Sequence, residues 1–191
     1  MKKIVLATKN KNKLKEINSL FKSLLDIDVV LPDSYIDVEE TGETFLENAS
    51  LKASETAKKM HLPSLADDSG LCVDALNGRP GVYSSRYEKD DDSRINKLLS
   101  ELKDKDNRSA HFCCAMALSD ENGNIFFTAE GRCFGEIINE KKGSNGFGYD
   151  PVFFIPELGK TLAEISMDEK NKISHRSKAL SQVIDFLKTK A

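Results

Sequence analysis

Two adjacent aspartates, Asp67 and Asp68, follow a short apolar run and precede a Ser-Gly dipeptide. Neighbouring carboxylates oppose folding unless a cation or a set of hydrogen-bond donors compensates their charge. One interpretation is a site for Mg²⁺, which takes oxygen ligands from one or two carboxylates and from substrate phosphates. Glu39 and Glu40 are candidates for a further ligand. The alternative is a turn whose aspartates cap the backbone that follows.

A lysine-rich segment lies where a predicted strand, 4–8, gives way to a predicted helix, 12–25. The first turn of a helix presents free N–H groups and the positive end of the helix dipole, which favour phosphate. The candidate phosphate ligands are Thr8, Lys9, Asn10, Lys11, Asn12 and Lys13. The alternative is a turn whose lysines are only solvated.

A loop rich in glycine and aromatic residues occupies 146–151, with the sequence Gly-Phe-Gly-Tyr-Asp-Pro. Glycine lets a backbone approach a ligand closely, and Phe147 and Tyr149 offer ring faces for stacking a base. Pro151 stands where a dinucleotide-binding fingerprint needs its third glycine, so that motif is excluded. The alternative is a tight loop whose aromatic rings fill the core.

Three basic residues, Lys170, His175 and Arg176, fall within a predicted C-terminal helix, 168–188. Arg176 shares a helical face with apolar residues, so the spacing points its side chain inward. An inward cation needs a partner of opposite polarity. That partner is either a ligand or a structural carboxylate such as Asp150.

Alternating helices and strands, followed by a hairpin, surround these candidate residues. The apolar spacing predicts strands at 4–8, 29–31, 64–66, 71–76, 109–119, 125–138 and 152–155, and helices at 12–25, 44–60, 91–102 and 168–188. In this scheme 67–70 is a turn between two short strands, and Asn122-Gly123 is a hairpin turn. The pattern predicts an α/β fold with a mixed sheet in one domain spanning 1–191.

Composition excludes several classes of protein. The net charge of −3 argues against a nucleic-acid-binding surface, which usually carries a basic excess. No apolar run is long enough to span a membrane, and the apolar stretch near the start is too short for a secretion signal, so we expect a cytoplasmic protein. The four cysteines form no C-x-x-C pair, which favours buried thiols over zinc ligands.

Taken together, the order and spacing of these stretches resemble the inosine triphosphate pyrophosphatase family. The stretches that carry the resemblance are Leu6-Ala7-Thr8-Lys9-Asn10 with Lys13, Glu39-Glu40-Thr41-Gly42 with Glu47-Asn48-Ala49, 66–71, 78–87, 146–151 and 169–176. One position departs from the pattern, because many members of the family carry glycine where this chain has Lys9.

The resemblance implies an elongated α/β fold of two lobes around a mixed, twisted sheet, with the substrate in the cleft between the lobes. It implies a homodimer and a Mg²⁺-dependent hydrolysis of ITP, dITP or XTP to the monophosphate and pyrophosphate.

The resemblance also assigns roles on the phosphate side. Asp68 and Glu39 hold Mg²⁺, and Asp68, or a carboxylate beside it, orients and deprotonates the attacking water. The predicted phosphate ligands besides the 8–13 segment are Ser69 and Lys52.

On the base side, the resemblance implies that Phe147, Gly148 and Tyr149 flank the ring and that Asp150 fixes its edge. Lys170, His175 and Arg176 complete this set. Hypoxanthine and xanthine carry an acceptor oxygen at C6, where adenine carries a donor amino group. Cationic donors therefore match the first two bases and are left unpaired against adenine.

Two alternatives are compatible with the same residues. The first is a related pyrophosphatase that acts on other modified nucleotides. The second is a nucleotide-binding module without catalysis, against which the acidic residues argue, because they hinder the binding of a triphosphate without metal.

Overall fold

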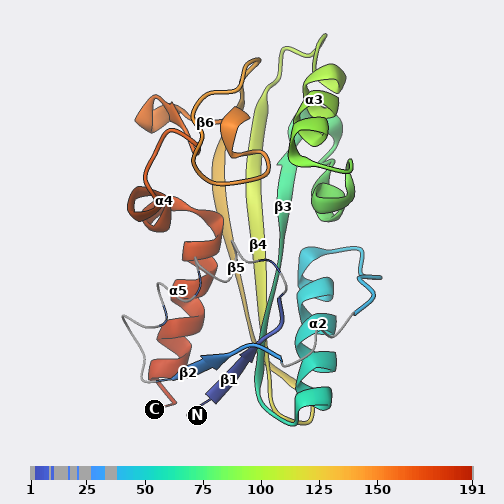
Figure 1. Ribbon diagram of the computed structural model, residues 1–191, viewed down its shortest axis with the longest axis vertical. Helices are drawn as coiled ribbons and strands as arrows, with labels where there is room; N and C mark the ends of the chain where they lie inside the picture. Colours follow the sequence, from blue (N-terminus) through green and yellow to red (C-terminus); the bar gives the residue numbers. More distant parts are fainter. Residues whose placement is uncertain are drawn as a thin grey trace. The chain divides into compact units, whose positions relative to one another are not determined.

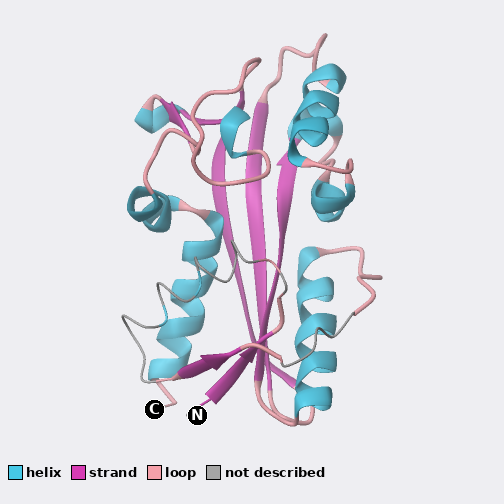
Figure 2. Cartoon of the chain, in the orientation of Figure 1, coloured by secondary structure: helices cyan, strands magenta, loops and turns pink. Residues whose placement is uncertain are grey.

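The computed structural model describes residues 3–8, 10, 17, 21, 27–32 and 38–190. Within these ranges the chain forms a mixed seven-stranded sheet with helices beside it, in the order β2-β1-β3-β4-β5-β6-β7 (Figures 1 and 2). The first strand, β1 (Lys3–Leu6), runs parallel to β2 (Asp28–Val30) and to β3 (Ser64–Val73). This confirms the predicted α/β class.

The second half of the sheet contains β4 (Ser109–Ser119), β5 (Ile125–Ile137), β6 (Phe153–Ile155) and β7 (Lys160–Thr161). The short strand β6 is antiparallel to both β5 and β7. A tight turn joins β4 to β5, in which the amide of Gly123 donates to the carbonyl of Asp120 over 3.0 Å. The predicted hairpin is therefore confirmed.

Two compact units make up the chain. Unit 1 contains Met1–Asp68, Cys114–Gly131 and His175–Ala191, and unit 2 contains Ser69–Cys113 and Arg132–Ser174. The long strands β3, β4 and β5 each contribute residues to both units.

Unit 1 has a different apolar layer on each face of its sheet. On one face, Leu65, Cys114 and Met116 pack with residues of helix α5 (His175–Lys188). On the other face, Ala66, Ala115 and Ala117 pack with alanines of helix α2 (Phe45–Met60). Since side chains alternate along a strand, Asp67 should face α5 and Asp68 should face α2.

The helices of unit 1 agree with the predictions where the chain is described. Helix α2 begins after Thr44, whose side chain accepts from the amide of Glu47 in a capping box, as expected for the predicted helix at 44–60. The predicted helix at 12–25 lies outside the described residues except for Ile17 and Phe21, both of which are fully buried in the α5-side core.

Unit 2 contains α3 (Asp91–Glu101), α4 (Met167–Ile173) and four short 3₁₀ helices, with its own apolar core. These turns are η1 (Asp74–Leu76), η2 (Gly81–Arg86), η3 (Asp150–Val152) and η4 (Pro156–Leu158). Asp90 caps α3 by accepting from the amide of Ser93 over 2.7 Å.

Three predicted boundaries are wrong. The predicted strand at 71–76 ends at Val73, because the backbone turns into the 3₁₀ helix η1 (Asp74–Leu76). Strand β3 runs without interruption through 67–70, where we expected a turn, because its two carboxylates find separate partners on α2 and α5. The predicted helix at 168–188 is two helices, because Ser174 adopts extended backbone with φ of −66° and ψ of 154°. Apolar spacing continues across this single residue and therefore hides the break.

Among the described residues, no helix has both the length and the apolar composition needed to cross a membrane.

Candidate active site

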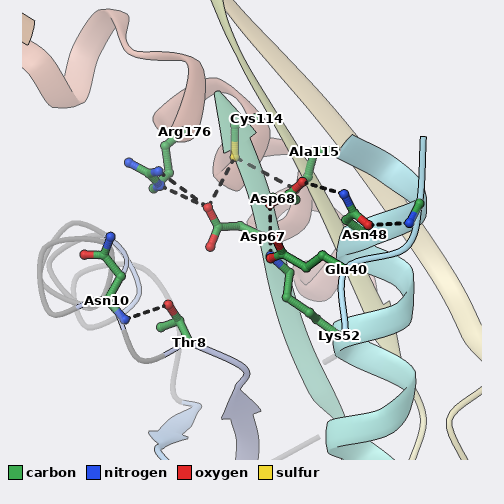
Figure 3. Close-up of polar contacts among 11 residues, drawn as sticks. Thr8, Asn10, Glu40, Asn48, Lys52, Asp67, Asp68, Cys114, Ala115 and Arg176 are labelled. Atoms are coloured by element: carbon green, nitrogen blue, oxygen red, sulfur yellow. Dashed lines mark hydrogen bonds and ion pairs between the residues drawn. The ribbon is translucent and has the colours of Figure 1, made fainter. Parts of the chain in front are cut away.

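Asp67 and Asp68 meet different partners, as their alternation along β3 requires (Figure 3). The Oδ2 atom of Asp67 lies 3.4 Å from Nε of Arg176, the second residue of α5, and 3.9 Å from Sγ of Cys114. The carboxylate of Asp68 is held instead by side chains of α2. The protein therefore compensates the two adjacent charges separately, and the charge pair alone does not require a metal ion.

Two residues of α2 hold the two oxygens of Asp68. Nζ of Lys52 donates to Oδ1 over 3.0 Å, and Nδ2 of Asn48 donates to Oδ2 over 3.3 Å. Asn48 and Lys52 are four positions apart and so lie on one face of the helix. The same Lys52 ammonium donates to Oε1 of Glu40 over 2.8 Å. One cation thus lies between two carboxylates that come from distant parts of the sequence (Figure 3).

The environment of Lys52 fixes its charge. Burial by itself lowers the pKa of its ammonium, but the negative charges of Asp68, Asp67 and Glu40 outweigh burial and raise the pKa above the ordinary 10.5. Lys52 is therefore cationic at neutral pH. It can donate hydrogen bonds to carboxylate or phosphate oxygens, but it cannot act as a general base.

The acidic residue that shares Lys52 with Asp68 is Glu40, whereas Glu39 is exposed. Our prediction of Glu39 as a metal ligand stays a prediction, and Glu40, the other candidate, is the one that shares Lys52 with Asp68. In the described ranges no three His, Cys, Asp or Glu side chains are grouped as a metal site would need. Two carboxylates nevertheless fit Mg²⁺, because this ion normally completes its coordination with substrate phosphates and water.

The end of β1 brings two of the predicted phosphate ligands into unit 1. Leu6 pairs with Leu65, so Thr8 follows the strand end close to the part of β3 that carries the aspartates (Figure 3). The amide of Asn10 donates to Oγ1 of Thr8 over 3.1 Å. The other predicted ligands of this segment, Lys9, Lys11, Asn12 and Lys13, lie outside the described residues. Ser69 is half-buried and directly follows Asp68 in β3.

The glycine-aromatic loop forms a second polar group, within unit 2. Oδ2 of Asp150 accepts from the amide of Phe147 over 3.0 Å and from Nζ of Lys170 over 2.6 Å. The side chains of Asp150 and Lys170 are 3% and 5% exposed. Nζ of Lys170 also lies 4.9 Å from the ring centroid of Phe147, within the range of a cation–π contact.

The glycines of this loop have separate structural roles. Gly146 has a φ of 75°, and a Cβ at this position would collide with the carboxylate of Asp150. The amide of Gly148 donates to Oδ2 of Asp91 over 2.8 Å, so the first turn of α3 anchors the loop. Our sequence prediction missed this contact, because an acidic residue in a first helical turn is expected for the helix dipole alone.

Tyr149 belongs to the core of unit 2 and has little open ring surface. It is 4% exposed, and its hydroxyl donates to the backbone oxygen of Ser84 over 3.0 Å. Burial raises the pKa of this phenol. The core-filling alternative therefore describes Tyr149, whereas Phe147 keeps partial exposure.

The basic residues near the C-terminus divide between the units. Lys170 lies in α4 and pairs with Asp150, while Arg176 lies in α5 and pairs with Asp67. His175 is buried at the start of α5. The structural carboxylate of Arg176 is thus Asp67, not the Asp150 that we considered.

The comparisons with known proteins cover almost the whole chain. The model of the Ham1 family matches residues 4–186. A protein of Geobacillus kaustophilus named dITP/XTP pyrophosphatase is 49% identical, over 96% of this chain and 93% of its own. A Nostoc sp. protein of the same name is 48% identical, over 95% and 92%.

Solved structures agree with this result. A HAM1 protein from Coxiella burnetii superposes with a TM-score of 0.90 at 46% identity, and the Staphylococcus aureus Ham1 protein with 0.89 at 42%. Each comparison covers all of both chains. On the match to the family model and on these relatives, the chain belongs to the Ham1 family.

Proposed function

We propose that this protein hydrolyses non-standard purine nucleoside triphosphates, namely dITP, XTP and ITP, to the monophosphate and pyrophosphate. The relatives named dITP/XTP pyrophosphatase support this assignment. The observation that carries it is the arrangement around Asp68, whose two oxygens are held by Lys52 and Asn48 while Glu40 shares the same lysine. A positioned carboxylate beside a permanent cation suits the hydrolysis of an anhydride between phosphates.

In this proposal Asp68 accepts the proton of the water that attacks the substrate. Asn48 and Lys52 keep the plane of its carboxylate fixed, and the Lys52 ammonium offsets negative charge on the phosphates. Mg²⁺, when bound, would be held by Asp68 and Glu40 and would withdraw charge from the phosphate oxygens. Thr8, Asn10 and Ser69, with the rest of the 8–13 segment, bind the phosphate chain.

On the base side, the ring of Phe147 stacks on the purine and Lys170 donates to the oxygen at C6. Asp150 positions both residues, because its carboxylate accepts a hydrogen bond from the backbone amide of Phe147 and another from the ammonium of Lys170. Adenine presents an amino group at C6, so it would place a donor against the Lys170 ammonium where hypoxanthine and xanthine offer an acceptor. His175 and Arg176 remain predicted base ligands that rest on the family resemblance.

A pyrophosphate-release assay tests this function. Purified protein is incubated with dITP, XTP, ITP, GTP, ATP and a pyrimidine triphosphate, with and without Mg²⁺. We expect release from the first three nucleotides only, and only with Mg²⁺. Faster release from the pyrimidine would favour the related pyrophosphatase. Tight binding of ITP with no release in Mg²⁺ would favour a binding module.

Two further expectations concern the protein as a whole. We propose that it is a homodimer, which light scattering coupled to size-exclusion chromatography measures directly. We also propose that it works in the cytoplasm, where the nucleotide pool that it would cleanse is found; fractionation of cells that express it is the test.

A further inference from the structure

Asn48 is a fully buried amide whose two ends serve different segments of unit 1. Its Nδ2 donates to Oδ2 of Asp68 over 3.3 Å, and its Oδ1 accepts from the backbone amide of Gly42 over 2.8 Å. Gly42 lies two residues after Glu40 in the segment that precedes α2. One side chain therefore links the candidate catalytic aspartate to the chain segment that carries the second carboxylate (Figure 3).

The segment around Gly42 fits closely against the start of α2. A Cβ at Gly42 would lie 2.6 Å from Cβ of Glu47 and 2.8 Å from Oδ1 of Asn48. The amides of Glu43 and Thr44 both donate to Oε2 of Glu47, over 2.7 and 3.2 Å. Side chains at the start of α2 therefore accept hydrogen bonds from three backbone amides of this segment. Asn48 accepts from the Gly42 amide, which is the one nearest to Glu40 in the sequence.

From this geometry we infer that Asn48 is a positioning residue, which sets the orientation of the Asp68 carboxylate and fixes the Glu40 segment relative to it. The inference rests on the proposed function, since it assigns the purpose of the link to catalysis by Asp68. An apolar side chain would fill the same space but could hold neither group. Lys52 donates to Oδ1 of Asp68 and Asn48 donates to Oδ2, so these two side chains of α2 act from the same helix on rotation about the Cβ–Cγ bond of the carboxylate.

Two substitutions separate the two ends of the amide. Asn48→Leu removes both hydrogen bonds at similar volume, whereas Asn48→Asp keeps an acceptor for Gly42 and loses the donor to Asp68. Thr56→Val is the matched control, because Thr56 is a buried polar residue further along α2. For each variant we would measure kcat and KM for XTP, the thermal unfolding midpoint, and hydrogen exchange of the Gly42 amide.

We expect kcat to fall on the order of 10²-fold in both Asn48 variants, with KM changed by less than about threefold, because a misplaced catalytic group slows the reaction without removing substrate contacts. The Gly42 amide should exchange at least about tenfold faster in Asn48→Leu, and at close to the original rate in Asn48→Asp. Thr56→Val should leave kcat unchanged even where its unfolding midpoint falls.

A merely structural Asn48 would give a different pattern. In that case kcat would follow the unfolding midpoint across all three variants, and this result, or an unchanged kcat in Asn48→Asp, would overturn the inference. If the wild-type protein releases no pyrophosphate from any nucleotide, the proposed function is overturned instead. The link to Gly42 is then judged by hydrogen exchange alone, and unchanged exchange in Asn48→Leu would overturn that part too.

Discussion

Replacing Lys52 by methionine tests whether this one cation compensates two carboxylates. The side chains of Lys52 and Asp68 are 13% and 9% exposed, so their pair lies closer to the buried limit than to the surface limit. Removing one partner of a buried pair costs about 3–5 kcal/mol, while surface pairs contribute about 0–1 kcal/mol. Because Asn48 still donates to Asp68 in the variant, we expect a loss of about 3 kcal/mol.

A loss of this size is easily measured. For a chain of this length it corresponds to a fall of roughly 6–12 °C in the midpoint of thermal unfolding. Calorimetry at pH 7 is suitable, because a raised lysine pKa means that the stabilisation is complete below pH 10.5 and is lost only as the pH rises through the folded-state value. Lys58→Met is the control, since Lys58 forms a solvent-exposed pair with Glu55 on the same helix and should change stability by no more than about 0.5 kcal/mol.

Adding Mg²⁺ makes the test specific to the proposed metal site. Replacing Lys52 removes the ammonium that Asp68 and Glu40 share, so Mg²⁺ should stabilise Lys52→Met more than the wild-type protein. The reasoning is refuted if the two methionine variants unfold at the same temperature. An equal response of both proteins to Mg²⁺ would remove Asp68 and Glu40 as the metal ligands.

Three other substitutions and conditions test the remaining assignments. Asp68→Asn should lower kcat for XTP by roughly 10²–10⁴-fold, and near-wild-type turnover in the folded variant would exclude Asp68 as the base. Lys170→Met should raise KM for XTP and so lower the ratio of kcat/KM for XTP to kcat/KM for ATP. An unchanged ratio would exclude Lys170 from base recognition. Hydrogen bonds from backbone amides hold the pKa values of Asp90, Glu164 and Glu169 below their ordinary values. The stabilisation that these three carboxylates give is present above their unfolded-state pKa values and is lost as the pH falls through their folded-state pKa values. The temperature of the unfolding midpoint should therefore decrease once the pH is lowered below about 4.5. This decrease should be less steep in Asp90→Asn.

The sequence predicted the class of fold and most helices and strands, because apolar spacing records which faces are buried. It failed at 67–70, where two acidic residues suggested a turn but occupy the middle of β3. The partners that make this possible, Lys52 and Arg176, lie on helices far away in the sequence. No local pattern contains that information.

The candidate site shows the same limit at single residues. Glu39 and Glu40 are equivalent in the sequence, and only the position of the loop relative to α2 decides that Glu40 reaches Lys52. The spacing of Asn48 and Lys52 is readable in advance, since residues four apart share a helical face. That the shared face meets Asp68 depends on how α2 packs against the sheet, where small side chains let the helix approach closely.

The location of Asp68 within a strand has a consequence for catalysis. A carboxylate in a turn can move with its backbone, whereas Asp68 lies within β3, an interior strand of the sheet. Asn48 and Lys52 restrict the side-chain rotation of Asp68 from one helix. Since Asp67 faces the opposite layer, where Arg176 offsets its charge, the two acids stay adjacent without sharing one environment. Because side chains alternate between the two faces of β3, Asp67 pairs with Arg176 on one face, whereas Asp68 lies beside Lys52 and Glu40 on the other. A carboxylate next to a cation and a second carboxylate is the arrangement that a phosphate-cleaving site requires.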